Sequence, residues 1–215
     1  MSKQFQYSTF SLLGAIVVTL LVGTRLQLPF AGGNGYVPRL SVRTVEVLGT
    51  VTESRAYRVM PITAHPRRGA SITTERDARI LLDVDGTRIG LYEDTEIELR
   101  TLTEDQIEIV IKKGRLVVDS LRAPERNVIV QTHTTAAMTT GGTMSVVYYD
   151  WQQRISIIPL VESVNVTIAK DYSVSTDAPL DISEVSPYPV TETTFSIEGS
   201  VAEEFYTWFQ RVNAS

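Results

Sequence analysis

The chain alternates apolar and polar residues over many short segments, a pattern that predicts β-strands. Between residues 80 and 168 the apolar residues of each segment stand two positions apart, so they project from one face of a strand. Val45, Val47 and Val51 predict an earlier strand. The regular sets are Ile80/Leu82/Val84, Ile89/Leu91, Ile97/Leu99, Ile107/Ile109/Ile111, Leu116/Val118, Val128/Val130, Met144/Val146/Tyr148, Ile155/Ile157 and Val164/Val166/Ile168.

Turn-forming residues separate these segments. Asp85-Gly86 is the clearest hairpin signal, because both central residues of a type I′ turn need a positive φ. The other separators are Lys113-Gly114, Ala123-Pro124, Gly141-Gly142 and Asp150-Trp151. Short strands with a turn about every 8–12 residues predict an all-β domain, an antiparallel sandwich, roll or barrel.

The first 25 residues predict a membrane anchor. Gln4 to Thr24 is a run of 21 uncharged residues, which as a helix spans roughly 30 Å, the thickness of a bilayer core. A cleaved signal peptide is the competing interpretation, although bulky residues follow where a peptidase requires small ones. We expect an uncleaved, single-pass anchor with the body outside the cytoplasm, in the periplasm or at the cell surface. The expected membrane-facing residues are Leu12, Leu13, Ile16, Val17, Leu20 and Leu21.

The C-terminal region differs from the strand-rich middle. Residues 177–199 contain three prolines and no basic residue, which predicts an extended linker. Ser200-Val-Ala-Glu203 then has the form of a capping box and predicts an amphipathic helix over 200–215. Phe205, Trp208 and Phe209 share one face of that helix. An isolated helix of this length is marginal in water, so it must dock on its own β-domain, on a partner protein or on the bilayer surface.

Charge and composition exclude several function classes. The formal charge of −5 and the pI of about 5.1 argue against nucleic-acid binding. The absence of cysteine excludes disulfides, thiolate zinc sites and iron–sulfur clusters. After Lys170 the chain has eight acids and a single base, Arg211. This acidic tail folds back on the slightly basic body, meets a basic partner or stays solvated.

The residues that could carry catalysis or bind metal do not form a recognisable site. His133 stands between Thr132 and Thr134, but nothing supplies the third member of a nucleophilic triad. His65 has no ligand spacing to His133. The Asp83-Val-Asp-Gly86 segment lacks the remaining ligands of a calcium loop, and the cluster of Glu93, Asp94, Glu96 and Glu98 suits a solvated strand face better than glycoside cleavage. We therefore expect no enzyme activity, no metal and no cofactor.

The middle of the chain repeats a simple order of strands and turns. Residues 78–91 contain an apolar strand, Asp-Gly-Thr and a second apolar strand. Residues 94–99 and 107–118 continue with a strand and then with strand, Gly and strand. Residues 128–146 end in Gly-Gly-Thr-Met-Ser-Val. Together these stretches resemble the FecR-like domain, the extracytoplasmic β-module named after the ferric-citrate transport regulator, although His133 stands where that family usually has proline.

The resemblance implies a domain organisation and a fold. The expected order is an anchor over 1–25, an exit linker with the first strands over 26–75, the FecR-like β-domain over 76–176, the acidic linker over 177–199 and the helix over 200–215. The expected fold class is all-β, an antiparallel FecR-like roll or sandwich with an N-terminal transmembrane helix and a short C-terminal helix. Regulators of this family place an anti-sigma segment before the membrane helix. Only nine residues precede the apolar centre here, so we expect no sigma-factor control.

The predicted function is therefore a membrane-anchored, extracytoplasmic module that binds another cell-envelope protein. Phe205, Trp208 and Phe209 are the expected protein-interaction residues, because aromatic residues are common in binding hot spots. An exposed edge strand is a second candidate surface. The alternative is a structural or accessory subunit of a membrane complex or surface polymer. The expected partners are the lipid bilayer, an envelope protein and, in an oligomer, further copies of the chain.

Overall fold

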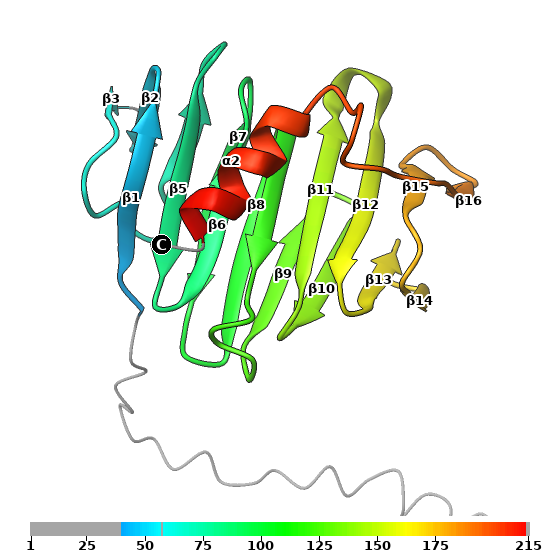
Figure 1. Cartoon of the computed structure of the whole chain (residues 1–215). Helices are drawn as coiled ribbons and strands as arrows, with labels where there is room; N and C mark the ends of the chain where they lie inside the picture. Colours follow the sequence, from blue (N-terminus) through cyan, green and yellow to red (C-terminus); the bar gives the residue numbers. More distant parts are fainter. Residues whose placement is uncertain (1–39, 57, 214–215) are drawn as a thin grey trace, which may run out of the picture. The chain divides into compact units, whose positions relative to one another are not determined.

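The computed structural model describes residues 40–56 and 58–213 (Figure 1). The predicted anchor, including the stretch from Leu12 to Leu21, lies outside these residues. Within the described part of the chain, no helix is both long enough and apolar enough to cross a bilayer. The predicted exit linker begins outside the described residues as well.

One sheet, called sheet I here, contains eight strands in antiparallel pairs. In order across the sheet they are β1 (Val42–Leu48), β5 (Arg79–Val84), β6 (Thr87–Leu91), β8 (Gln106–Asp119), β11 (Thr143–Tyr149), β12 (Arg154–Val161), β15 (Leu180–Ser183) and β16 (Val190–Glu192). A 3₁₀ turn, η1 (Asp150–Gln152), connects β11 to β12.

The second sheet, sheet II, contains nine strands and shares β8 with sheet I. Its neighbours pair antiparallel, except for the parallel pair β8 and β9. In order they are β3 (Arg58–Pro61), β2 (Val51–Arg55), β4 (Ser71–Thr74), β7 (Glu96–Leu102), β8, β9 (Asn127–Gln131), β10 (Thr135–Thr140), β13 (Val164–Ile168) and β14 (Tyr172–Thr176).

The shared strand β8 passes from one sheet to the other at Gly114. Residues up to Lys113 pair in sheet II, and residues from Gly114 onward pair in sheet I. Gly114 has a φ of +92°, and a Cβ there would lie 2.5 Å from Cα of Thr95. The prediction of a chain-reversing turn at Lys113-Gly114 is therefore wrong. The glycine bends a continuous strand where another backbone lies too close for a side chain.

The space between the two sheets holds the main core. Every residue of the regular alternating sets is fully or almost fully buried there, apart from the half-buried Tyr148. The first predicted strand is the exception. Val45 and Val47 are each 37% exposed, because β1 has a bulge between Thr44 and Glu46 and lies at the edge of sheet I. The third predicted residue, Val51, is in the core but belongs to β2 of sheet II, and Val42 is the core residue of β1. The alternation thus identified the buried face wherever a strand has neighbours on both sides.

Asp85-Gly86 forms the predicted two-residue hairpin between β5 and β6. Its residues have φ values of 50° and 91°, and Val84 pairs directly with Thr87. Both central residues therefore have the positive φ that a type I′ turn requires.

The C-terminal region departs from its prediction in two ways. The segment predicted as an extended linker, residues 177–199, contains β15 and β16, which extend sheet I by two strands. The helix α2 (Glu203–Asn213) begins three residues later than predicted. Its capping box does not form, because the Glu203 carboxylate accepts a hydrogen bond from the Gly199 amide (2.9 Å) and the Ser200 hydroxyl has no partner in the described structure.

The described fold has three layers. Sheet II packs on the inner face of sheet I, and α2 lies across the outer face of sheet I (Figure 1). A strand-rich, mainly antiparallel domain with one short C-terminal helix confirms the corresponding parts of the predicted fold class.

Candidate functional site

The predicted interaction residues of α2 face the chain's own β-domain. Phe205, Trp208 and Phe209 are each at most 3% exposed, in a cluster that also contains Leu81 of β5 and Val117 of β8. Of the docking options open to this helix, the structure shows the intramolecular one. A partner could contact the three aromatic side chains only after α2 had left the sheet, so their binding to another protein stays a prediction.

Gly90 of β6 makes room for the helix. A Cβ at Gly90 would lie 2.5 Å from Cδ2 of Phe209, so the aromatic ring lies directly over the strand backbone. Glycine inside a strand often marks such a close approach. The ring of Phe205 contacts Tyr92 with centroids 5.0 Å apart. The aromatic face of α2 and the outer face of sheet I therefore have complementary shapes.

Polar contacts fix one position of α2 on the sheet. The Tyr206 hydroxyl lies 2.9 Å from Oγ of Ser145 and accepts a hydrogen bond from Nη1 of Arg115 (3.2 Å). The indole Nε1 of Trp208 donates to Oε1 of Glu46 (2.9 Å). Buried Tyr and Trp normally satisfy their polar atoms, and these partners come from three different strands.

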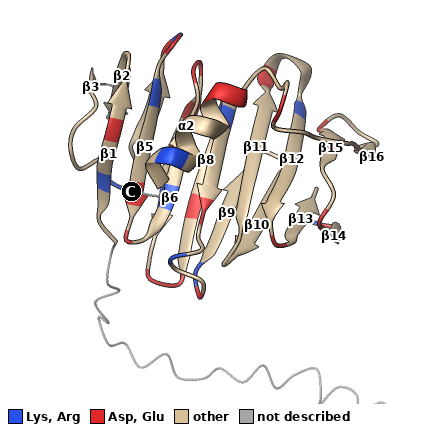
Figure 2. Cartoon of the chain, in the orientation of Figure 1, with Lys and Arg blue, Asp and Glu red and all other residues tan. Residues whose placement is uncertain are grey.

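The last turn of α2 is held by sheet I and by the turn that follows β8. Nη1 of Arg88 donates to the Val212 carbonyl (3.3 Å), Nη2 of Arg122 donates to the Asn213 carbonyl (2.6 Å), and the Asn213 amide donates to Asp119. Cations and donors are favourable there because the last carbonyls of a helix have no intrahelical partner. Figure 2 shows acidic residues at the start of α2 and basic residues on the strands beneath it. The C-terminal end of the acidic tail thus folds back on the basic body.

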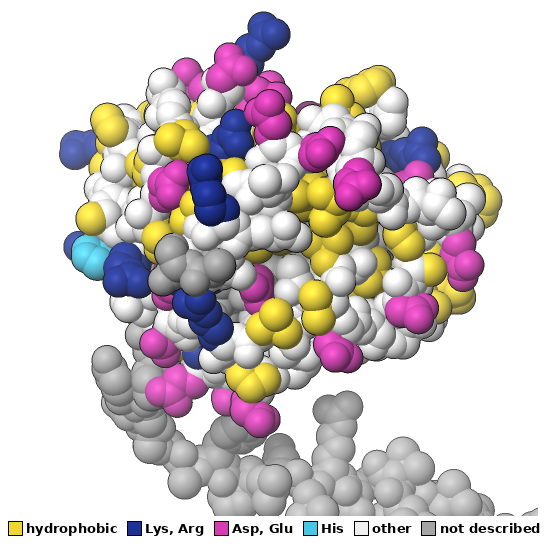
Figure 3. Space-filling model, viewed as in Figure 1, with side chains coloured by type: hydrophobic (Ala, Val, Ile, Leu, Met, Phe, Trp, Pro, Cys, Tyr) yellow, Lys and Arg dark blue, Asp and Glu magenta, His cyan; other side chains and the backbone are white. Residues whose placement is uncertain are grey.

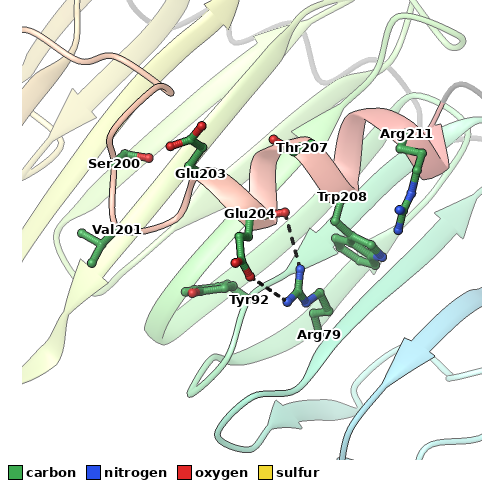
Figure 4. Close-up of a pocket in the computed structure, with 9 residues that line it drawn as sticks. All are labelled: Arg79, Tyr92, Ser200, Val201, Glu203, Glu204, Thr207, Trp208 and Arg211. Carbon is green, nitrogen blue, oxygen red and sulfur yellow. Dashed lines mark hydrogen bonds and ion pairs between the residues drawn. The ribbon is translucent and has the colours of Figure 1, made fainter.

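A groove of about 700 Å³ runs beside α2 (Figure 4). Arg79 lies in it with its guanidinium 5.8 Å from the ring centre of Trp208 and 3.8 Å from the Glu204 carboxylate. Burial, and secondarily the neighbouring Glu93 carboxylate, raises the pKa of Tyr92 at its margin. Arg79 is already paired with Glu204, so the groove does not present a single sign of charge to a ligand.

His133 lines a separate hollow of about 480 Å³. Burial, followed by the Glu184 carboxylate, raises the pKa of Tyr148 in this hollow to about 12. The Thr132 hydroxyl donates to the same Glu184 carboxylate, and no hydrogen bond joins His133 to a threonine among the described side chains. The structure therefore does not bring His133 and a neighbouring threonine together as a base and its nucleophile. Sequence reasoning missed Tyr148 and Glu184 because 36 residues separate them.

The other candidate groups have structural partners. Nδ1 of His65 lies 3.2 Å from the Val42 carbonyl. Glu96 pairs with Lys112 (2.9 Å), and Asp83 pairs with Arg88 (3.0 Å). Across the ranges 40–56 and 58–213, no three histidine, aspartate or glutamate side chains gather as a metal site.

The most prominent exposed aromatic residue is Trp151, in η1. Its side chain is 77% exposed, and Tyr149 beside it is also exposed. The turn is well fixed, since the Gln153 amide donates to the Asp150 carbonyl (3.2 Å) and the Glu184 amide donates to the Gln153 carbonyl (2.7 Å). The sequence predicts only a turn at this position. An aromatic residue at a turn does not reveal its exposure until the neighbouring strands are placed.

Charges of both signs are interspersed on the face that carries α2, with apolar side chains exposed between them (Figure 3). This distribution lacks the broad basic surface that a nucleic-acid backbone attracts, in line with the acidic pI.

These features define a strand-rich class of domain: two sheets joined through one strand and covered by a C-terminal helix. More particularly, residues 70–158 match the family model described as FecR protein, which confirms the predicted resemblance to the FecR family. The match runs from the residue before β4 to the middle of β12.

Two crystal structures of a candidate anti-sigma factor from Parabacteroides distasonis have a similar fold. At 14% sequence identity they superpose with TM-scores of 0.53 and 0.52, and each alignment covers 65% of this chain and 64% of the other. The chain thus spans just under two thirds of the length of these structures. No curated protein matches it.

Proposed function

We propose that this chain is a non-enzymatic signalling module, anchored in the cell membrane with its β-domain outside the cytoplasm, that acts by binding another cell-envelope protein. Two comparisons support a regulatory role: the FecR match over residues 70–158 and the fold shared with a candidate anti-sigma factor. The uncharged run from Gln4 to Thr24 supports membrane anchoring.

The observation that carries the binding proposal is the exposure of Trp151 on a fixed turn. Tryptophan buries on the order of 200 Å² when it is covered, and it is among the residues most enriched in binding hot spots. Trp151 needs no rearrangement to meet a partner, whereas the aromatic residues of α2 are already covered. We therefore place the centre of the partner site at η1.

The polar groups that could support an enzymatic function have other roles in the fold. Glu96 is bound to Lys112, and Glu98 lies 3.9 Å from Arg100, on the outer side of a strand. Thr132 is bound to Glu184 instead of to His133. These contacts favour the binding function over hydrolysis.

A photo-crosslinking amino acid at position 151 of the full-length chain, in its own cells, tests this proposal. The matched control is position 201, since Val201 is apolar and 95% exposed but lies just before α2. We expect one discrete adduct from position 151, at least ten-fold more abundant than from position 201, which mass spectrometry identifies as an envelope protein. Equal adducts from both positions would show that exposure alone explains the crosslinking and would refute the site.

A substitution then measures the contribution of the side chain. Trp151→Ala should reduce co-purification of the crosslinked partner at least ten-fold, about 1.4 kcal/mol or more, as expected for a hot spot. Trp151→Phe, which keeps an aromatic ring, should retain part of the binding. Unchanged recovery with Trp151→Ala would contradict the proposal, and recovery in a fixed-stoichiometry assembly would favour the structural-subunit alternative.

Location is tested separately by protease accessibility. In intact cells with a permeable outer barrier, external protease should digest the β-domain, and the chain should sediment with membranes. Protection of the domain until the membrane is lysed would place it in the cytoplasm and exclude an extracytoplasmic partner.

A further inference from the structure

Four strands lie at the edges of the two sheets: β1 and β16 in sheet I, and β3 and β14 in sheet II. An edge strand presents unpaired backbone amides and carbonyls, and proteins usually protect it with charge, proline, a bulge, shortness or a covering loop. A comparison of the four edges therefore shows which of them is free to pair with another strand.

Three edges carry such protection. β1 has a bulge and is covered by the segment that follows β3, because the Thr44 amide donates to the Ala64 carbonyl (2.9 Å) and the Thr44 hydroxyl donates to the Thr63 carbonyl (2.8 Å). β3 has four residues, including Arg58 and Pro61. β16 has three residues, one of them Glu192.

β14 carries none of these protections. Its sequence, Tyr-Ser-Val-Ser-Thr, contains no charge and no proline, and its ladder with β13 runs from Tyr172 to Thr176 without a register shift. Within the described chain, β13 is the single strand that pairs with it. Tyr172 is 54% exposed, and Val174 is half-buried at the margin of the main core.

We propose that β14 pairs antiparallel with β14 of a second copy of this chain, so that sheet II continues across a two-fold dimer. The two-fold axis passes beside Val174, which faces its own counterpart. Ser173 then faces Ser175, and Tyr172 faces Thr176, in both directions. This symmetric arrangement uses one surface of each copy, as an isologous dimer requires.

The chemistry of β14 favours an identical strand as its partner. Two copies of a charged edge bring like charges close together, which is destabilising, whereas the five residues of β14 bring none within the ladder. Asp171 and Asp177, which flank the strand, face each other just beyond the two ends of this ladder. On the inner face, the pairing covers the exposed part of Val174 with the same side chain of the other copy, so the two cores become continuous. On the outer face, Ser173 and Ser175 place hydroxyls opposite each other, where each can donate and accept.

The contact is small. A five-residue strand pair buries much less than the roughly 1,600 Å² of a standard stable interface, so we expect association that depends on concentration. The proposed membrane anchor confines copies to two dimensions and so raises their local concentration. The dimer itself does not rest on the Trp151 site, which belongs to a different pair of strands.

Single cysteines test the pairing and its register, because the chain has no cysteine of its own. Directly opposite residues of an antiparallel pair have Cα atoms about 4.5–5.5 Å apart, within the range that a disulfide bridges. Val174→Cys therefore places two thiols face to face. Ser173→Cys places them on a diagonal, about 7–8 Å apart. Val59→Cys, on the exposed opposite edge of sheet II, measures random collision.

We expect full-length Val174→Cys to form disulfide dimers under mild oxidation at least ten-fold faster than either Ser173→Cys or Val59→Cys. Equal rates for Val174→Cys and Val59→Cys would refute the dimer, and faster crosslinking of Ser173→Cys would refute its register. Partner crosslinking through position 151 should persist in all three variants, so failure of the dimer is distinguishable from failure of the proposed function.

Complementary charges provide a second test that also reports folding. Val174→Lys and Val174→Glu should each be monomeric, because like charges face each other across the axis. A mixture of the two should form heterodimers, measured by sedimentation velocity with one variant labelled. A mixture that stays monomeric while both variants keep the circular dichroism of the unaltered chain would overturn the proposal.

Discussion

At the scale of single residues, the contact of Gly90 with Phe209 determines how closely α2 approaches sheet I. Gly90→Ala would place a methyl group 2.5 Å from the ring and force the helix outward. Overpacking of this kind costs about 1–3 kcal/mol. We expect that loss in the free energy of unfolding, measured with urea.

The same contact provides its own control through a double variant. Phe209→Ala removes a buried ring and should cost about 3–5 kcal/mol. Because the ring is then absent, adding Gly90→Ala should cost little more. Additive losses in the double variant would show that the glycine matters for another reason.

Tyr148 contributes to the dependence of domain stability on alkaline pH. Its pKa is raised from 10 to about 12 in the folded chain, so between those values the folded state holds a proton that the unfolded state has lost. The stabilising effect is complete below pH 10 and disappears as the pH rises toward 12. Tyr148→Phe should therefore reduce the steepness of alkaline unfolding above pH 10, measured by circular dichroism, with the exposed Tyr172→Phe as control. An unchanged slope would contradict this role.

At the scale of the elements, the bend of β8 depends on Gly114. Gly114→Ala meets both a positive φ and the close approach of Thr95, whereas Gly69→Ala meets a positive φ with nothing within 4 Å. The left-handed conformation costs each alanine variant about 1–2 kcal/mol, and overpacking adds about 1–3 kcal/mol at Gly114 only. Urea unfolding should show the larger loss for Gly114→Ala. Equal losses would show that the bend tolerates a side chain.

The helix α2 behaves as a cover of sheet I, and its removal should have a measurable effect. Deleting residues 200–215 exposes Leu81 and Val117, so the truncated chain should bind more of a hydrophobic dye and melt at a lower temperature. A synthetic peptide of residues 198–215 should reverse both changes in trans. The same peptide with serine at positions 205, 208 and 209 should not, and reversal by that control would show that the aromatic face is not what holds the helix.

At the scale of the whole molecule, the sequence predicts local geometry better than the assignment of strands to sheets. Asp85-Gly86 reveals its hairpin because the required φ values are a property of those two residues. The sequence of Gly141-Gly142 predicts a similar turn between strands. This turn instead connects β10 of sheet II to β11 of sheet I, and these two strands do not pair with each other. Residue pattern fixes the direction in which a side chain points, whereas the choice of neighbouring strand depends on contacts far along the chain.

The candidate site shows the same division. The helical spacing of the aromatic residues predicts the apolar face of α2. That sheet I covers this face depends on Gly90 and Ser145, which lie more than 60 residues earlier in the chain. The exposure of Trp151 and the unprotected edge at β14 follow from the absence of neighbours in space. The sequence alone does not show either feature, because the identity of a residue does not say which neighbours cover it in the folded chain.

The passage of β8 through both sheets also determines how the domain loses its structure. A single continuous strand supplies a central member of each sheet, and it pairs with β6 and β11 at one end and with β7 and β9 at the other. Neither sheet can dissolve while the other keeps its full set of partners. Heating should therefore produce one cooperative transition, in which probes on the two sheets report the same midpoint. A change that removes β8 from its neighbours would disrupt both sheets at once.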